Sequence, residues 1–176
     1  MINVAFIRSW FFLIVLSTMS ACHAGPVPIT FLPVENPQDL TLKVLRSDSI
    51  CGGITHSQWI AREEDYQNVL QSMGQQARND SAPQSLPVDF TRSGVLLVSM
   101  GQQRTGGYAI SLANQQLHIA NSTAIVEVRW QEPKPGMMLT QMLTNPCLFI
   151  EVPRGEYKTI EVHDQSQQIR ASVEIN

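Results

Sequence analysis

The residues of this chain that could act as nucleophiles lack the pattern of a catalytic motif. Cys51 lies shortly before His56, and a cysteine beside a histidine can form a nucleophile with its base. We favour the other interpretation, a structural cysteine and a surface histidine, because closeness in a turn does not establish catalytic geometry. Ser99 falls inside an apolar segment, without a G-x-S-x-G motif around it. The sequence therefore predicts a protein that is not an enzyme, with an uncharacterised hydrolase as one alternative.

Residues that bind metals or phosphates are also scattered. The histidines form no H-x-x-x-H motif and the cysteines no C-x-x-C motif. Gly106 and Gly107 precede a predicted strand, whereas a phosphate-binding loop leads into a helix. Copper(I) binding by methionines is a further alternative, although methionine more often fills gaps in a core. We expect no metal and no cofactor. The residues considered are His56, His118, His163, Met100, Met137, Met138 and Met142.

The segment GQQRTGGYAI, residues 101–110, is the best candidate for a binding loop. It joins two apolar segments that are typical of strands, and its two glycines can adopt positive φ, which predicts a sharp reversal as in a hairpin. Arginine and tyrosine are favoured at binding hot spots, although Tyr108 could instead start the core face of the next strand. A second apolar turn follows Lys134. The predicted binding residues are Arg104, Thr105, Gly106, Gly107, Tyr108, Pro135, Gly136, Met137 and Met138.

Composition limits the classes of partner. The formal net charge is −3, and no basic run stands out, which argues against nucleic acid as a partner. Cys51 and Cys147 would tend to pair in an oxidising compartment, and two separate buried thiols are the alternative.

The N-terminus has the features of an export signal. Arg8 precedes a short apolar segment, which is too short to span a membrane. Met19-Ser20-Ala21-Cys22 resembles a bacterial lipobox, in which Cys22 is lipidated; ordinary cleavage after Ala24 is the alternative. We predict a signal peptide at 1–24, a Pro-rich tether at 25–38 and one domain at 39–176. The expected location is the periplasm or, with a lipid anchor, the outer membrane.

One helix and several strands are expected to position these loops. Helical spacing of apolar residues predicts a helix that starts at a cap at Thr55 or Ser57, includes Trp59 and Ile60, and ends near Gly74. Short strands with alternating or continuous apolar residues follow it, including an uninterrupted apolar segment at 147–152 that suits a strand covered on both faces. This pattern predicts an α+β fold: a mostly antiparallel β sandwich or open barrel with one packed N-terminal helix.

Several segments in order resemble the C-terminal domain of the PrcB-type protease-complex subunit family. They are Val88-Asp89-Phe90, the apolar segment 95–98, Gly101 with Thr105-Gly106-Gly107-Tyr108, the strand 125–130, Pro135-Gly136, and 141–146 leading into 147–152. The resemblance covers roughly residues 86–153. It implies a non-catalytic domain of a lipoprotein that accompanies a surface protease.

A more distant resemblance suggests a different activity for the same loop. Thr105-Gly106-Gly107-Tyr108 is similar to a loop of chagasin-type inhibitors of cysteine proteases, although the Arg-Pro-aromatic loop of that family is absent. We therefore expect an exported accessory or binding protein that engages a protein partner, such as an envelope or secreted protease, through these loops. A chagasin-like inhibitor is the alternative.

Overall fold

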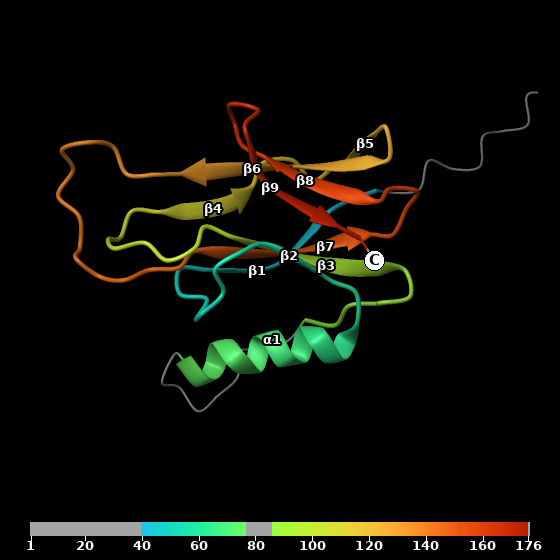
Figure 1. The fold of residues 1–176 in the computed structure, drawn as a ribbon, viewed down its shortest axis with the longest axis horizontal. Helices are drawn as coiled ribbons and strands as arrows, with labels where there is room; N and C mark the ends of the chain where they lie inside the picture. Colours follow the sequence, from blue (N-terminus) through green and yellow to red (C-terminus); the bar gives the residue numbers. More distant parts are fainter. Residues whose placement is uncertain (1–39, 77–85, 176) are drawn as a thin grey trace, which may run out of the picture. The chain divides into compact units, whose positions relative to one another are not determined.

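Two sheets and one helix form three layers in the computed structural model, which describes residues 40–76 and 86–175. Figure 1 shows the helix on one side of the first sheet and the second sheet on its other side. Both described stretches belong to one unit, Asn36–Asn176. The predicted signal peptide, lipobox cysteine and tether lie outside the described residues. Among the residues described, no helix is both long enough and apolar enough to span a membrane.

The first sheet has the strand order β1-β7-β3-β2 and is antiparallel throughout. Its members are β1 (Lys43–Asp48), β7 (Cys147–Pro153), β3 (Ser93–Ser99) and β2 (Gln58–Ile60). The central strands β3 and β7 are buried on both faces, because one face packs on the second sheet and the other on the helix. This confirms the prediction from the continuous apolar segment at 147–152.

The second sheet has the order β4-β6-β8-β9, and β5 also pairs with β6. Its members are β4 (Ala109–Leu112), β5 (His118–Ala120), β6 (Thr123–Gln131), β8 (Thr159–His163) and β9 (Ile169–Glu174). Only β6 and β8 pair in parallel among the described strands. Alternate residues of β6, namely Ala124, Val126 and Val128, are fully buried against the first sheet. The predicted α+β fold, a mostly antiparallel β sandwich or open barrel with one packed helix, is thus confirmed in the form of two open sheets and one helix.

The predicted start of the helix is wrong. Helix α1 spans Glu63–Gln76, whereas Trp59 and Ile60 belong to β2, where they pair with Leu96 and Val95. Ser57 does not cap a helix, because its hydroxyl accepts a hydrogen bond from the Ser99 N–H (3.1 Å). A short apolar pair fits either periodicity, so neighbouring β3 decides the outcome. The apolar face of α1, which carries Tyr66, Leu70 and Met73, packs on the first sheet as expected.

The predicted hairpin at the two glycines is also wrong. β3 pairs with β2 and β7, whereas β4 pairs with β6, so residues 100–108 cross from one sheet to the other. Of the two glycines, only Gly107 has a positive φ (91°). A two-residue hairpin turn would have placed both strands in one sheet, but β3 and β4 contribute apolar residues to the same core from opposite sheets.

The predicted disulfide is confirmed. Cys51 and Cys147 are bonded, with their Cα atoms 6.0 Å apart, and both side chains are completely buried. The bond ties the segment between β1 and β2 to the first residue of β7.

Candidate functional site

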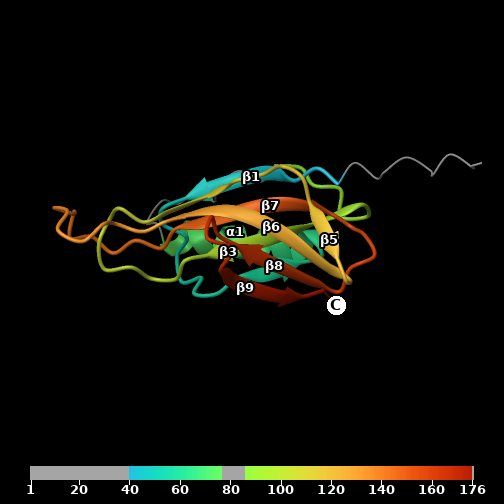
Figure 2. The ribbon, with the colours of Figure 1, turned by 90° about the horizontal axis from the view of Figure 1, so that it is seen from above.

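Two loops that are distant in sequence pair at one end of the two sheets. We call residues 101–108 and 133–144 the paired loops; they connect β3 to β4 and β6 to β7. Gln103 and Thr144 exchange two backbone hydrogen bonds (2.7 and 2.9 Å), and the Gly106 N–H donates to the Thr140 carbonyl (3.0 Å). The Thr144 hydroxyl donates to the Thr105 carbonyl (3.0 Å). Figures 1 and 2 both show these loops side by side. The structure therefore brings together two separate loops on which the sequence predicted binding residues.

Glycines allow this close approach and shape the turn. A Cβ atom on Gly107 would lie 3.0 Å from Leu139 Cδ2 and 3.2 Å from Pro133 Cβ, and the positive φ of this residue further disfavours a side chain. In the second loop, the Met137 N–H donates to the Lys134 carbonyl (3.3 Å), with Gly136 at φ 82°. Proline followed by a glycine of positive φ is the sequence of a type II turn. Pro135 and Gly136 thus present the two methionines that follow them.

The paired loops expose several large apolar side chains. Met138 is fully exposed, and more than half of the Met137 and Leu143 side chains is accessible, with Met142 close behind. Arg104 and Lys134 are also exposed, and neither makes a hydrogen bond or ion pair through its side chain with the described residues. Tyr108 is different, because it is half-buried and packs against the core. Tyr108 therefore starts the core face of the next strand, which was the alternative interpretation from the sequence.

Charge separates the paired loops from the rest of the molecule. The loops contain Arg104 and Lys134 and no acidic residue. The remaining described residues include twelve acidic and eight basic side chains, a net charge of −4. An apolar surface with two cations thus protrudes from an otherwise acidic domain. A partner with an acidic rim would be attracted to it.

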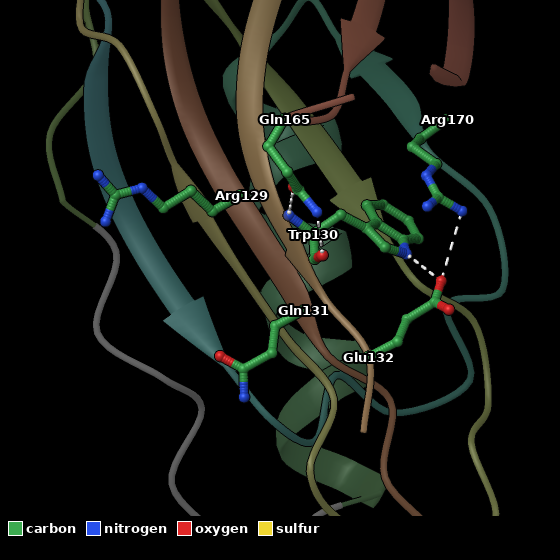
Figure 3. Close-up of a pocket in the computed structure, with 6 residues that line it drawn as sticks. All are labelled: Arg129, Trp130, Gln131, Glu132, Gln165 and Arg170. Atoms are coloured by element: carbon green, nitrogen blue, oxygen red, sulfur yellow. Dashed lines mark hydrogen bonds and ion pairs between the residues drawn. The ribbon is translucent and has the colours of Figure 1, made fainter. Parts of the chain in front are cut away.

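A pocket that the sequence did not predict lies beside the last residues of β6, near the paired loops (Figure 3). It has a volume of about 560 Å³. The Gln165 side chain accepts a hydrogen bond from the Trp130 N–H (2.9 Å) and donates one to the Trp130 carbonyl (3.0 Å). It thus takes the place of a neighbouring strand beyond the end of β8. The Gln131 side chain donates to the Gly107 carbonyl (3.3 Å), which links the pocket to the paired loops. Its lining residues are Arg129, Trp130, Gln131, Glu132, Gln165 and Arg170.

An irregularity in β9 places Arg170 over the indole ring of Trp130. The pairing of β8 with β9 shifts register between Val162 and His163, so that Arg170 is the extra residue of a bulge. Its guanidinium carbon lies 5.1 Å from the centre of the ring, a cation–π contact. The sequence showed a regular alternation here, and a bulge has no reliable signature in one sequence.

Asp164 holds this arginine in place. Its side chain is almost fully buried and accepts hydrogen bonds from the Arg170 guanidinium (2.8 Å) and from the backbone N–H groups of Ser166 (2.7 Å) and Gln168 (3.0 Å). Burial alone would raise the pKa of Asp164, but these hydrogen bonds and the positive charge of Arg170 outweigh it and hold the pKa below its ordinary value. Most polar groups of the pocket are thus bonded to one another and stabilise this end of the sheet.

One family model matches part of the chain. Residues 95–153 match the model described as PrcB C-terminal. This part of the chain belongs to the PrcB C-terminal family. The predicted resemblance is therefore confirmed. Searches of curated proteins and of solved structures found no match.

The PrcB C-terminal match includes both paired loops completely. It runs from β3 through β7, whereas β1, β2, α1, β8 and β9 lie outside it. Gln165 and Arg170, which complete the pocket, are therefore outside the match, and so is Cys51. The paired loops are the part of the candidate surface that the PrcB C-terminal match covers.

The nucleophiles considered from the sequence have structural roles here. The disulfide takes up the Cys51 thiol that a pair with His56 would need. Ser99 is buried, and its hydroxyl lies within hydrogen-bond distance of the Ile54 carbonyl (3.0 Å) and Asn145 Oδ1 (3.2 Å) while accepting from the Gly101 N–H (3.0 Å). The residues described contain no group of three or more His, Cys, Asp or Glu side chains that could hold a metal ion.

Proposed function

We propose that this protein is a non-catalytic accessory protein of the cell envelope that binds a protein partner through its paired loops. The observation that carries the proposal is the exposed apolar surface at this site, made by Met137, Met138, Met142 and Leu143. A cluster of exposed apolar side chains on a soluble domain is typical of an interaction site. Methionine suits such a surface because its flexible thioether adapts to irregular apolar contacts.

The free energy gained by burying a few apolar side chains is large enough to support binding. Complete burial of one methionine side chain contributes about 1.5–3 kcal/mol. Two or three such side chains, placed in an apolar cleft, could provide the centre of a protein interface. Arg104 and Lys134 would then lie at the rim, where they would accelerate association with an acidic partner.

Export and anchoring are part of the same proposal. A buried disulfide is compatible with an oxidising compartment outside the cytoplasm. Lipidation of Cys22 would hold the domain at a membrane, with its paired loops free to meet envelope or secreted proteins. The resemblance noted from the sequence makes a protease the first class of partner to test.

Crosslinked recovery of partners from the cell envelope tests the proposal. We expect the combined variant Arg104→Ala, Met137→Ser, Met138→Ser to recover specific partners at least about ten-fold less than the wild type, because loss of one hot spot weakens binding by this factor or more. Proteins recovered in each case can be counted by quantitative mass spectrometry.

The matched control changes side chains of the same kinds elsewhere. Ile119→Ser with Lys158→Ala removes an exposed apolar side chain and an exposed cation on the β5 side of the second sheet. Its recovered partners should equal those of the wild type, and both variants should melt at the wild-type temperature. An unchanged set of partners with the paired-loop variant would show that these loops are not the binding surface.

Protease inhibition is a second function for the same surface. The pairing of two loops at one end of a β sandwich favours it, since an inhibitor of this kind inserts adjacent loops into an active-site cleft. A panel of papain-like enzymes separates the two functions. Nanomolar inhibition that the paired-loop variant loses would favour an inhibitor, whereas partner recovery without inhibition would favour an accessory protein.

A further inference from the structure

We propose that the exposed methionines of the paired loops are oxidation sites, at which peroxides form methionine sulfoxide and thereby weaken binding by this surface. The modification depends only on the exposure of these side chains. Its effect on binding rests on the proposed function, and the experiments below separate the two.

The five described methionines fall into two groups. Met138 is 101% exposed, Met137 56% and Met142 48%, all in one loop. Met73 and Met100 are only 4% and 9% exposed, because they pack in the two cores. A peroxide must reach the sulfur atom to react. Oxidation should therefore concentrate on the paired loops.

No accessible thiol competes for the oxidant within residues 40–76 and 86–175. A thiolate is the usual first target of peroxides in a protein. The two cysteines in these stretches are joined in the disulfide and completely buried. The thioethers of the paired loops are thus the sulfur groups that a peroxide can reach in the described domain.

The reaction is a transfer of one oxygen atom. The methionine sulfur donates an electron pair to one peroxide oxygen, the O–O bond breaks, and an S–O bond forms. The leaving hydroxide takes the proton that the transferred oxygen still carries, which leaves the sulfoxide and one molecule of water. The sulfur is oxidised by two electrons and hydrogen peroxide is reduced, with no further reactant.

The product has the wrong polarity for an apolar contact. A sulfoxide carries a strong hydrogen-bond acceptor, and burying it without a donor is unfavourable. Leu143, beside Met142 in the same loop, cannot react in this way and is 60% exposed. Leucine in place of methionine nearly conserves volume and apolar character. A leucine variant should therefore keep the surface apolar and resist oxidation, whatever its own affinity for the partner.

Peptide mapping tests the modification itself. Purified full-length protein is treated with hydrogen peroxide for increasing times and analysed by mass spectrometry. We expect Met138 to be oxidised at least about ten-fold faster than Met100, since accessibility governs the rate. In urea the two rates should become equal. Equal rates in the folded protein, or faster oxidation of Met100, would overturn the assignment.

Crosslinked recovery tests the effect on binding. After peroxide treatment, the wild type should recover at least about five-fold less partner, because its apolar contacts are lost. The variant Met137→Leu, Met138→Leu, Met142→Leu, compared with its own untreated sample, should recover the same amount of partner after peroxide treatment. Equal losses for both proteins, or no loss for either, would refute the effect on binding. If untreated wild type and the paired-loop variant recover the same partners, the proposed function fails, and the effect on binding fails with it, whereas the mapped oxidation sites would stand.

Discussion

At the scale of single residues, buried polar side chains hold distant segments together. Asn145, directly after the second paired loop, donates through Nδ2 to the carbonyls of Gly52 and Ile54 (2.7 Å each). Its backbone N–H donates to the Ser49 carbonyl (2.9 Å), and its carbonyl accepts from the Cys51 N–H (3.0 Å). Asn145-Pro146 was part of the pattern that suggested the family. Its physical role is to dock the disulfide-bearing segment beside β3 and β7.

Substitution of Asn145 should therefore destabilise the fold. Asn145→Ala removes the donor of the two hydrogen bonds to the part-buried carbonyls of Gly52 and Ile54, which should lower the free energy of unfolding by about 2–3 kcal/mol. Urea denaturation measures this change. Gln115→Ala, which truncates an exposed amide, is the control and should stay within about 0.5 kcal/mol of the wild type. A wild-type midpoint for Asn145→Ala would show that these bonds contribute nothing.

Asp164 should make stability depend on pH in the acid range. Its pKa is lowered in the folded protein by the hydrogen bonds of Gln168, Ser166 and Arg170, which outweigh the effect of burial. The contribution is therefore present above the unfolded-state pKa, about 3.9, and is lost as the pH falls through the lower folded-state value. We expect Asp164→Asn to be less stable than the wild type at neutral pH, and to lose less stability below about pH 4.

Denaturation curves at several pH values between neutral and strongly acid conditions check this prediction. Glu174→Gln is the control, because Glu174 is an exposed carboxylate on β9. Its curves should parallel those of the wild type. Identical acid dependence for Asp164→Asn and the wild type would contradict the prediction.

At the scale of elements, β3 and β7 form the centre of the domain. They lie between the helix and the second sheet, and the disulfide fixes the segment before β2 to the start of β7. The paired loops extend from the ends of these strands, so the packed centre of the domain supports the apolar surface. The disulfide is the covalent part of this centre.

Loss of the disulfide should cost more stability than most single substitutions. It joins cysteines 96 residues apart, so it should contribute about 3–5 kcal/mol by restricting the unfolded chain. The variant Cys51→Ala, Cys147→Ala should unfold at a correspondingly lower urea concentration. Reduced wild-type protein is the matched comparison and should agree with the variant. A variant as stable as the oxidised wild type would contradict this expectation.

At the scale of the whole molecule, the polarity of the surface is divided between two regions. The paired loops carry two cations and four exposed apolar side chains, whereas the other described residues have a net charge of −4. Acidic residues elsewhere favour solubility, and the cationic loops attract only partners of opposite charge. A partner with an acidic surface would therefore be expected to approach the domain from the side of the paired loops.

The sequence by itself determined the class of fold, the two-sided burial of residues 147–152 and the resemblance of residues 95–153 to the PrcB C-terminal family. These features depend on the local periodicity of apolar residues and on the order of short motifs, which one chain displays directly. The sequence also predicted a disulfide between Cys51 and Cys147, although it left two separate buried thiols as an alternative.

Only the tertiary structure decided which segments meet. Trp59 and Ile60 fit a helical pattern, but pairing with β3 made them a strand. Gly106 and Gly107 suggested a hairpin, but packing across the core sent the chain to the other sheet. The backbone bonds between the paired loops, and the bulge that places Arg170 over Trp130, also depend on residues distant in sequence. Such contacts leave no local periodic signal, because their energy comes from partners that come together only when the chain folds.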